Sequence, residues 1–160
     1  MLSVGMSASE SSSNSIPGRL VEILLVDDDA GDVYLAQEAF EDCHLRNQLH
    51  VASDGEQAMA FLRRTGEFTA APRPDLILLD LNMPRMGGHE VLSELKSDPD
   101  LSDIPIVIVT GNDSEGEILK AYNLSVDCYI TKPIDVTKLM IAVCSIPHFQ
   151  VAVVTTAQAI

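Results

Sequence analysis

Acidic, hydroxyl and basic residues stand at the ends of short apolar segments of this chain. Asp27 and Asp28 follow EILLV, Asp80 follows LILL, Thr110 follows PIVIV, and Lys132 comes shortly after CYI. An aspartate can act as the nucleophile that accepts a phosphoryl group and forms an acyl phosphate. A lysine can hold a phosphoryl oxygen as a point charge, and a threonine hydroxyl can hydrogen-bond another. These residue types together indicate phosphoryl chemistry on a carboxylate.

The three carboxylates also predict a metal site, provided that the fold brings them together. Two like charges 4 Å apart repel by about 4 kcal/mol at an effective dielectric near 20, and a cation relieves that repulsion. Magnesium favours oxygen ligands and retains several waters, so two carboxylates and one backbone carbonyl would suffice. We therefore expect Mg²⁺ as the cofactor.

The elements that must position these residues alternate along the chain. Apolar segments at 22–26, 49–53, 75–79, 105–110 and 126–130 predict strands, and amphipathic segments at 29–43, from 54, 88–96, 114–122 and 135–145 predict helices. Strands that are apolar throughout are buried on both faces, which is typical of a parallel sheet covered by helices. The pattern predicts a doubly wound, five-stranded α/β fold with a parallel sheet.

Ligands bind such sheets outside the carboxyl ends of the strands, near the point where the strand order reverses. With the strand order 2-1-3-4-5, all the polar residues named above lie on one rim of the sheet. Asp28 and Asp80 are then near neighbours across the switch point.

Composition narrows the classes of protein further. The formal net charge is −14 and the chain has only ten lysines and arginines, which argues against direct binding to nucleic acid or to an anionic membrane. No apolar stretch is long enough to span a bilayer and no signal peptide is recognisable, so we expect a cytoplasmic protein. Cys43, Cys128 and Cys144 are far apart in apolar surroundings, which predicts buried, reduced thiols.

Four short motifs in order resemble the receiver domain of two-component response regulators, over about residues 22 to 146. They are VDDD (26–29), DLNMPRMGG (80–88), VTG (109–111) and YITKP (129–133). The resemblance implies a flavodoxin-like fold and a chain that catalyses only its own phosphorylation and dephosphorylation.

The resemblance also implies a role for each matching residue. Asp80 is the phosphoacceptor, Asp28 binds the metal directly, and Asp27 helps through water. The Asn82 backbone carbonyl completes the protein ligands. Thr110 follows the phosphoryl group, Lys132 binds it, Tyr129 is the aromatic switch, and the Lys132–Pro133 bond is cis.

Within the family, the connector 64–74 and the stretches 118–133 and 145–149 resemble single-domain regulators associated with phytochromes. This resemblance implies a sensor histidine kinase as partner, with a phytochrome-type photoreceptor kinase as one candidate, and output through protein contacts or a phosphorelay. We expect a disordered tail over residues 1–20, the receiver over 21–146 and an extension over 147–160. The extension is largely apolar after Pro147. We expect it to pack as an extended segment across the face formed by the helix at 114–122, the strand at 126–130 and the last helix, or to exchange with a partner chain. We expect that face to form a homodimer.

Two alternatives from other classes remain open. An aspartyl phosphatase would resemble D-x-D-x-T, but Asn82 stands where that pattern has its second acid. A pseudo-receiver would be a binding module that never carries phosphate, but the set of Asp28, Asp80, Thr110 and Lys132 argues against it. Phosphorylation in the presence of magnesium separates the three possibilities.

Overall fold

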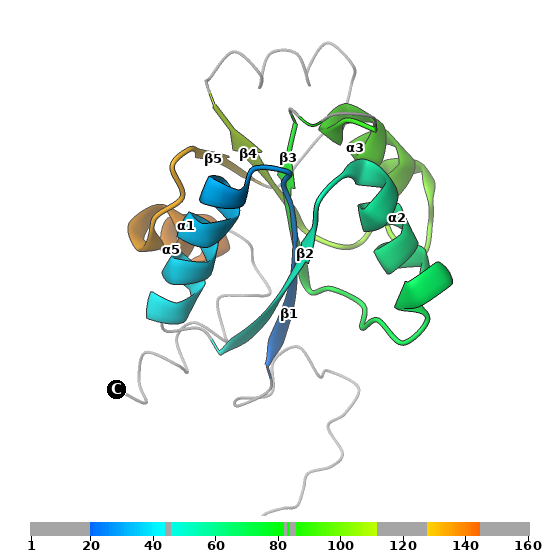
Figure 1. Ribbon diagram of the computed structural model, residues 1–160, viewed down its shortest axis with the longest axis horizontal. Helices are drawn as coiled ribbons and strands as arrows, with labels where there is room; N and C mark the ends of the chain where they lie inside the picture. The colour runs from blue at the N-terminus through cyan, green and yellow to red at the C-terminus, as the bar shows by residue number, and fades with distance from the viewer. Residues whose placement is uncertain (1–19, 44–45, 82, 84–85, 112–127, 145–160) are drawn as a thin grey trace, which may run out of the picture.

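The fold is a five-stranded parallel sheet with helices on both faces. In a computed structural model, the described residues are 20–43, 46–81, 83, 86–111 and 128–144. The strands are β1 (Val21–Val26), β2 (Asn47–Ala52), β3 (Leu76–Asp80), β4 (Ile106–Thr110) and β5 (Cys128–Thr131). They lie in the order β2-β1-β3-β4-β5, and every neighbouring pair is parallel (Figure 1). The predicted fold class and strand order are confirmed.

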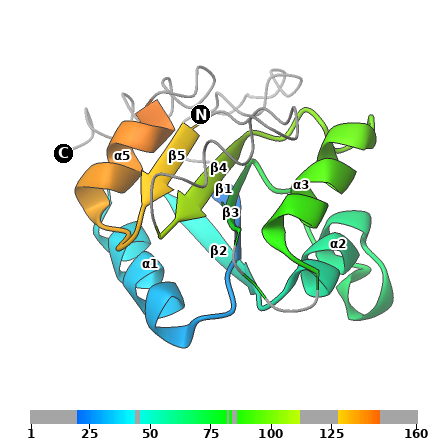
Figure 2. The ribbon, with the colours of Figure 1, turned by 90° about the horizontal axis from the view of Figure 1, so that it is seen from above.

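The helices divide between the two faces of the sheet. They are α1 (Ala30–Asp42), α2 (Gly55–Arg63), α3 (Gly88–Ser97) and α5 (Val136–Cys144), and a short 3₁₀ helix, η3 (Gly66–Phe68), lies in the connector after α2. Seen from above, α1 and α5 cover one face and α2 and α3 the other (Figure 2). The predicted helix at 114–122 lies outside the described residues.

Strand β3 shows why both faces are needed. Successive side chains of a strand point to opposite faces. Leu76 and Leu78 accordingly pack with the core beneath α1 and α5, whereas Ile77 and Leu79 pack with the core beneath α2 and α3. All four are fully buried, so a sequence without polar alternation is the expected one for this strand.

Side-chain caps start the two helices that follow β1 and β2. Asp29 accepts a hydrogen bond from the backbone N–H of Asp32, and Asp54 accepts one from that of Gln57. Each cap satisfies a backbone donor that has no partner within the helix. The helix after Asp29 therefore begins at the rim where β1 ends.

Helix α1 buries Ala36 and Phe40 and leaves Leu35 exposed. The cysteines differ in part from the sequence-based expectation. Cys144 is exposed at the end of α5 and Cys43 is half-buried, so the prediction of buried thiols is wrong for Cys144. Neither cysteine forms a disulfide. The side chain of Cys128 lies outside what the structure describes.

Two further predictions remain untested. The tail 1–20, apart from Leu20, and the extension 147–160 fall outside the described ranges, so that division of the chain stays a prediction. None of the helices in the described part of the chain is long and apolar enough to cross a membrane.

Candidate functional site

The predicted site residues gather at the carboxyl ends of four strands. Asp27 and Asp28 directly follow β1, and Asp80 and Thr110 are the last residues of β3 and β4. Lys132 directly follows β5. The register pairs Val26 with Leu79, Asp80 with Val109, and Thr110 with Thr131, so these ends are level. Backbone pairing alone therefore brings the polar groups to one rim.

Three carboxylates lie together at this rim. Asp27, Asp28 and Asp80 each offer an oxygen, and these oxygens lie within 4.8 Å of one another. Asp27 and Asp80 are buried, at 1% and 3% exposed, whereas Asp28 is exposed. The predicted proximity of Asp28 to Asp80 agrees with this geometry.

The buried Asp27 carboxylate tests whether a cation suits the site. Its Oδ1 accepts a hydrogen bond of 2.9 Å from the backbone N–H of Asp29, but its buried Oδ2 has no hydrogen-bond partner in the described part of the chain. Burial raises the pKa of Asp27, and the Asp29 N–H and the charge of Lys132 offset this only in part. The Lys132 ammonium lies 3.4 Å from this oxygen without a hydrogen bond to it. An ionised oxygen buried without a hydrogen bond is costly, so the residues present fit a divalent cation with its waters.

Lys132 supplies the positive charge of the site. Its Nζ lies 2.6 Å from Asp32 Oδ2, 3.2 Å from Asp80 Oδ2 and 3.4 Å from Asp27 Oδ2. Burial by itself lowers the pKa of the Lys132 ammonium, but the hydrogen bond to Asp32 and the charges of Asp80 and Asp27 outweigh it and hold the pKa above its ordinary value. The ammonium therefore stays charged throughout the physiological pH range.

Asp32 is the member of this cluster that the sequence reasoning missed. It lies in the first turn of α1, three positions after the capping residue Asp29. A usable signal was present, because an acidic residue in the first turn of the helix after β1 must lie near the carboxyl end of β1. The pattern alone did not show that it would contact a lysine 100 positions further on.

The two predicted switch residues lie in neighbouring strands. Thr110 is buried, and its backbone carbonyl accepts a hydrogen bond of 2.8 Å from the Lys132 N–H. Tyr129 is 42% exposed, and its strand position pairs with Ile108. The Lys132–Pro133 bond is cis, as the resemblance implies. Asn82 lies outside the described residues.

Close packing explains one glycine beside the site. A Cβ at Gly88 would overlap the backbone carbonyl oxygen of Asp80 and would lie 2.6 Å from the Leu81 Cα. Only a residue without a side chain lets α3 begin this close to the end of β3. The backbone around Asp80 is thus held from the α3 side.

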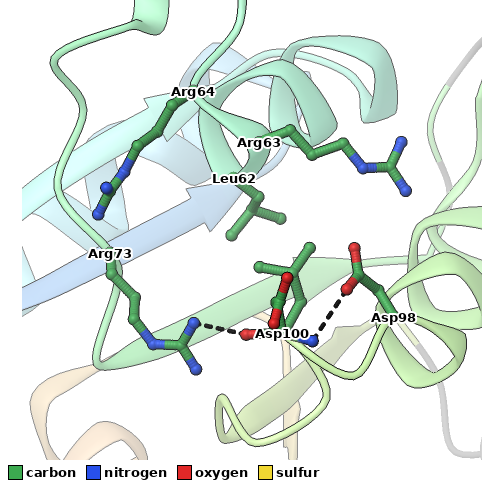
Figure 3. A pocket seen from close by; sticks show the side chains of 7 residues that line it. Leu62, Arg63, Arg64, Arg73, Asp98 and Asp100 are labelled. Carbon is green, nitrogen blue, oxygen red and sulfur yellow. Dashed lines mark hydrogen bonds between the residues drawn. The ribbon is translucent and has the colours of Figure 1, made fainter.

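A separate surface cleft lies between the end of α2 and the segments that precede β3 and β4, at the opposite ends of these strands from this rim. Figure 3 shows the side chains that line it. The cleft measures about 490 Å³ and is lined by Leu62, Arg63, Arg64, Arg73, Asp98, Asp100 and Leu101. Arg73 donates to the Asp100 carbonyl at 2.6 Å, the Asp100 N–H donates to Asp98, and Arg63 pairs with Glu94 at 3.0 Å. These contacts tie the connector to the loop before β4 and tie α2 to α3, so we assign the cleft a structural role.

The fold and the rim of acids define the class of protein. Residues 23–144 match the response regulator receiver domain family. The chain belongs to this family, and it is therefore a response regulator of two-component signal transduction.

Three relatives lie near this chain within the family. It is 43% identical to the response regulator Rcp1 of Synechocystis over 133 residues, which are 83% of this chain and 90% of Rcp1. The solved structure of the Mn²⁺-bound form of Rcp1 matches with a TM-score of 0.68 at 41% identity, over 79% of this chain and 93% of that one.

The names of the other two relatives mention phytochromes. The bacteriophytochrome response regulator RtBRR matches with a TM-score of 0.74 at 38% identity, over 79% of this chain and 78% of its own. The phosphorylated cyanobacterial phytochrome response regulator RcpA matches with a TM-score of 0.68 at 44% identity, over 78% and 89% of the two chains. Family membership favours a receiver over the aspartyl phosphatase considered above.

Proposed function

We propose that this chain accepts a phosphoryl group on Asp80 from the phosphohistidine of a sensor kinase. The observation that carries the proposal is the surroundings of the Asp80 carboxylate. It is nearly buried, lies 3.2 Å from a lysine ammonium, and is close to two further carboxylates. A structural ion pair would need the lysine but not the additional acids, and one ammonium does not balance the charge of Asp27, Asp28 and Asp80 together.

The transfer is a substitution at phosphorus. An Asp80 oxygen forms the new P–O bond as the P–N bond of the phosphohistidine breaks, and the nitrogen leaves with the bonding electron pair. Lys132 then binds a phosphoryl oxygen, and the Thr110 hydroxyl hydrogen-bonds another. Hydrolysis of the acyl phosphate returns the carboxylate, so the chain processes only its own phosphate.

The metal in this proposal is Mg²⁺. Asp27, Asp28 and Asp80 would hold it, Asp27 through water, together with the predicted Asn82 carbonyl. When bound, the ion neutralises charge on the transferred group. Support comes from the carboxylate cluster and from the Mn²⁺-bound form of Rcp1.

The chain acts in the cytoplasm, and its partner is a sensor histidine kinase, with a phytochrome-type photoreceptor kinase as one candidate. This part rests on the names of RtBRR and RcpA, which are structural neighbours of this chain and are phytochrome response regulators. Output passes through protein contacts, with Tyr129 following Thr110 toward the phosphoryl group. A homodimer through β5, α5 and the predicted helix 114–122 is part of the proposal. Tyr129 on β5 is 42% exposed and Ile141 on α5 is 66% exposed, so both offer apolar surface.

Incubation with acetyl phosphate and magnesium, followed by intact mass, tests the proposal. A receiver shows one phosphoryl adduct that Asp80→Asn abolishes. A phosphatase turns over acetyl phosphate without an adduct, and a pseudo-receiver does neither. Either of these last results would refute the proposed function.

A further inference from the structure

We infer that Asp32 is a positioning residue that competes with the phosphoryl group for the Lys132 ammonium. The inference rests on the proposed function of Asp80 as phosphoacceptor. Its starting point is the order of distances from Lys132 Nζ, which is 2.6 Å to Asp32 and 3.2 Å to Asp80. The ammonium thus makes its shortest contact with a residue outside the set that the family motifs assign.

Asp32 is held firmly in this place by its helix. Its backbone N–H donates to the Asp29 carboxylate at 3.0 Å, and α1 packs on the sheet through the buried Ala36 and Phe40. The first turn of a helix favours negative charge, so the helix dipole of α1 suits a carboxylate at Asp32. An anionic acceptor on α1 therefore contacts Lys132, which also contacts the phosphoacceptor Asp80 at the end of β3.

Asp32 and a phosphoryl group on Asp80 compete for the N–H donors and the positive charge of Lys132. Lys132 has three N–H donors, and Asp32 and Asp80 each accept one hydrogen bond, while Asp27 lies at ion-pair distance. A phosphoryl group on Asp80 brings further anionic oxygens that need this positive charge. Asp32 also repels those oxygens directly, because its carboxylate lies beside the same lysine.

The consequence is that the charge of Asp32 opposes the phosphorylated state. Replacing it with a neutral side chain leaves Lys132, among the described residues, with Asp80 and Asp27 as its ion-pair partners. Phosphoryl transfer and the binding of a phosphoryl mimic should then both become more favourable. We expect the affinity for a phosphoryl mimic and the rate of phosphorylation each to rise by about threefold to tenfold. This range lies between the effects of losing an exposed ion pair and of losing a charge-assisted hydrogen bond.

The test compares Asp32→Asn, Asp32→Glu and Asp42→Asn with the wild type in the full-length protein. Asp42 is exposed at the last position of α1, so Asp42→Asn removes the same charge from the same helix at a distance from the site. Beryllofluoride affinity is measured by ¹⁹F NMR and labelling by acetyl phosphate is followed by intact mass. Both use saturating Mg²⁺ for each variant, because losing an acid also weakens metal binding.

The expected result is that Asp32→Asn binds beryllofluoride about threefold to tenfold more tightly and is labelled faster by a similar factor. Asp32→Glu and Asp42→Asn should stay within about twofold of the wild type, because both keep a carboxylate near Lys132. Equal or weaker binding in Asp32→Asn, compared with Asp42→Asn, overturns the inference. So does a gain of equal size in Asp32→Glu, which keeps the carboxylate.

A second comparison shows whether Asp32 acts through the lysine. In a Lys132→Ala background, adding Asp32→Asn should change the rate of labelling much less than it does in the wild type. An undiminished effect would mean that Asp32 acts on the phosphoryl group alone, and would overturn the positioning role. Failure of the wild type to be labelled at Asp80 would instead refute the proposed function, so the two failures are distinguishable.

Discussion

Lys132 Nζ lies 3.2 Å from Asp80 Oδ2, although β4 separates the strands that position these two residues. The contact is possible because both side chains extend from the same rim, where the strand ends are level. It joins the centre of the sheet to its β5 edge. A change of charge at Asp80 therefore acts directly on a residue at that edge.

Asp80→Asn should leave the fold intact and abolish phosphorylation. An amide is a poor nucleophile and a weaker ligand for magnesium, but it has nearly the shape of the carboxylate. Circular dichroism checks the fold, and intact mass after acetyl phosphate checks labelling. Normal labelling of this variant would show that another residue is the phosphoacceptor.

Lys132→Ala should still bind metal and accept phosphate, yet fail to switch. The change removes a positive contact to the phosphoryl group but leaves the nucleophile in place. Without Mg²⁺ it should also lower the free energy of unfolding by about 1–3 kcal/mol, because the acids around it lose their counterion. Urea denaturation with and without Mg²⁺ measures this loss, and full phosphorylation-dependent activation would contradict the first part.

The raised pKa of Asp27 predicts a pH dependence for the metal-free protein. Its folded-state pKa exceeds its unfolded value, so protonation stabilises the folded state, and this contribution appears as the pH falls through the folded pKa. The free energies of unfolding of the wild type and of Asp27→Asn are compared in EDTA. On going from pH 7 to about pH 5, the wild type should become more stable relative to Asp27→Asn. A shift in the opposite direction would show that the Asp29 N–H and Lys132 outweigh burial.

Gly88→Ala should destabilise the protein by about 1–3 kcal/mol, since the new Cβ overlaps the Asp80 carbonyl. Gly111→Ala is the matched control, because a Cβ there meets nothing within 4 Å among the described residues. We expect its effect to stay within about 0.5 kcal/mol. Equal denaturation midpoints in urea for the two variants would mean that the β3–α3 junction relaxes at no cost.

The proposed dimer is tested by light scattering of the full-length protein and of a truncation at Ser145, each with and without beryllofluoride. We expect the full-length protein to dimerise and the truncation to weaken the dimer. Apolar side chains exposed on β5 and α5 need covering, and so does the largely apolar segment 149–160. A monomer in all four samples would remove the dimer from the proposal and leave Asp80 unaffected.

The strand order and the rim of acids were predictable from the sequence because the strands are apolar at nearly every position. Buried runs such as Leu76 to Leu79 leave few arrangements besides a covered parallel sheet, and the polar residue after each strand marks its carboxyl end. The contact between Asp32 and Lys132 was not predictable in this way. It depends on how α1 is rotated and packed against the sheet, and the exposure of Leu35 reports the same rotation.

The level strand ends have a consequence for how such a protein can diversify. The spacing of Asp80, Thr110 and Lys132 comes from backbone pairing between β3, β4 and β5. The surface of α1 is separate from this pairing, and its Tyr34 and Leu35 side chains are exposed. Replacing side chains on a helix surface does not alter the distance between hydrogen-bonded strands. A lineage can therefore exchange one signalling partner for another by surface substitutions while the chemistry at the rim is inherited unchanged.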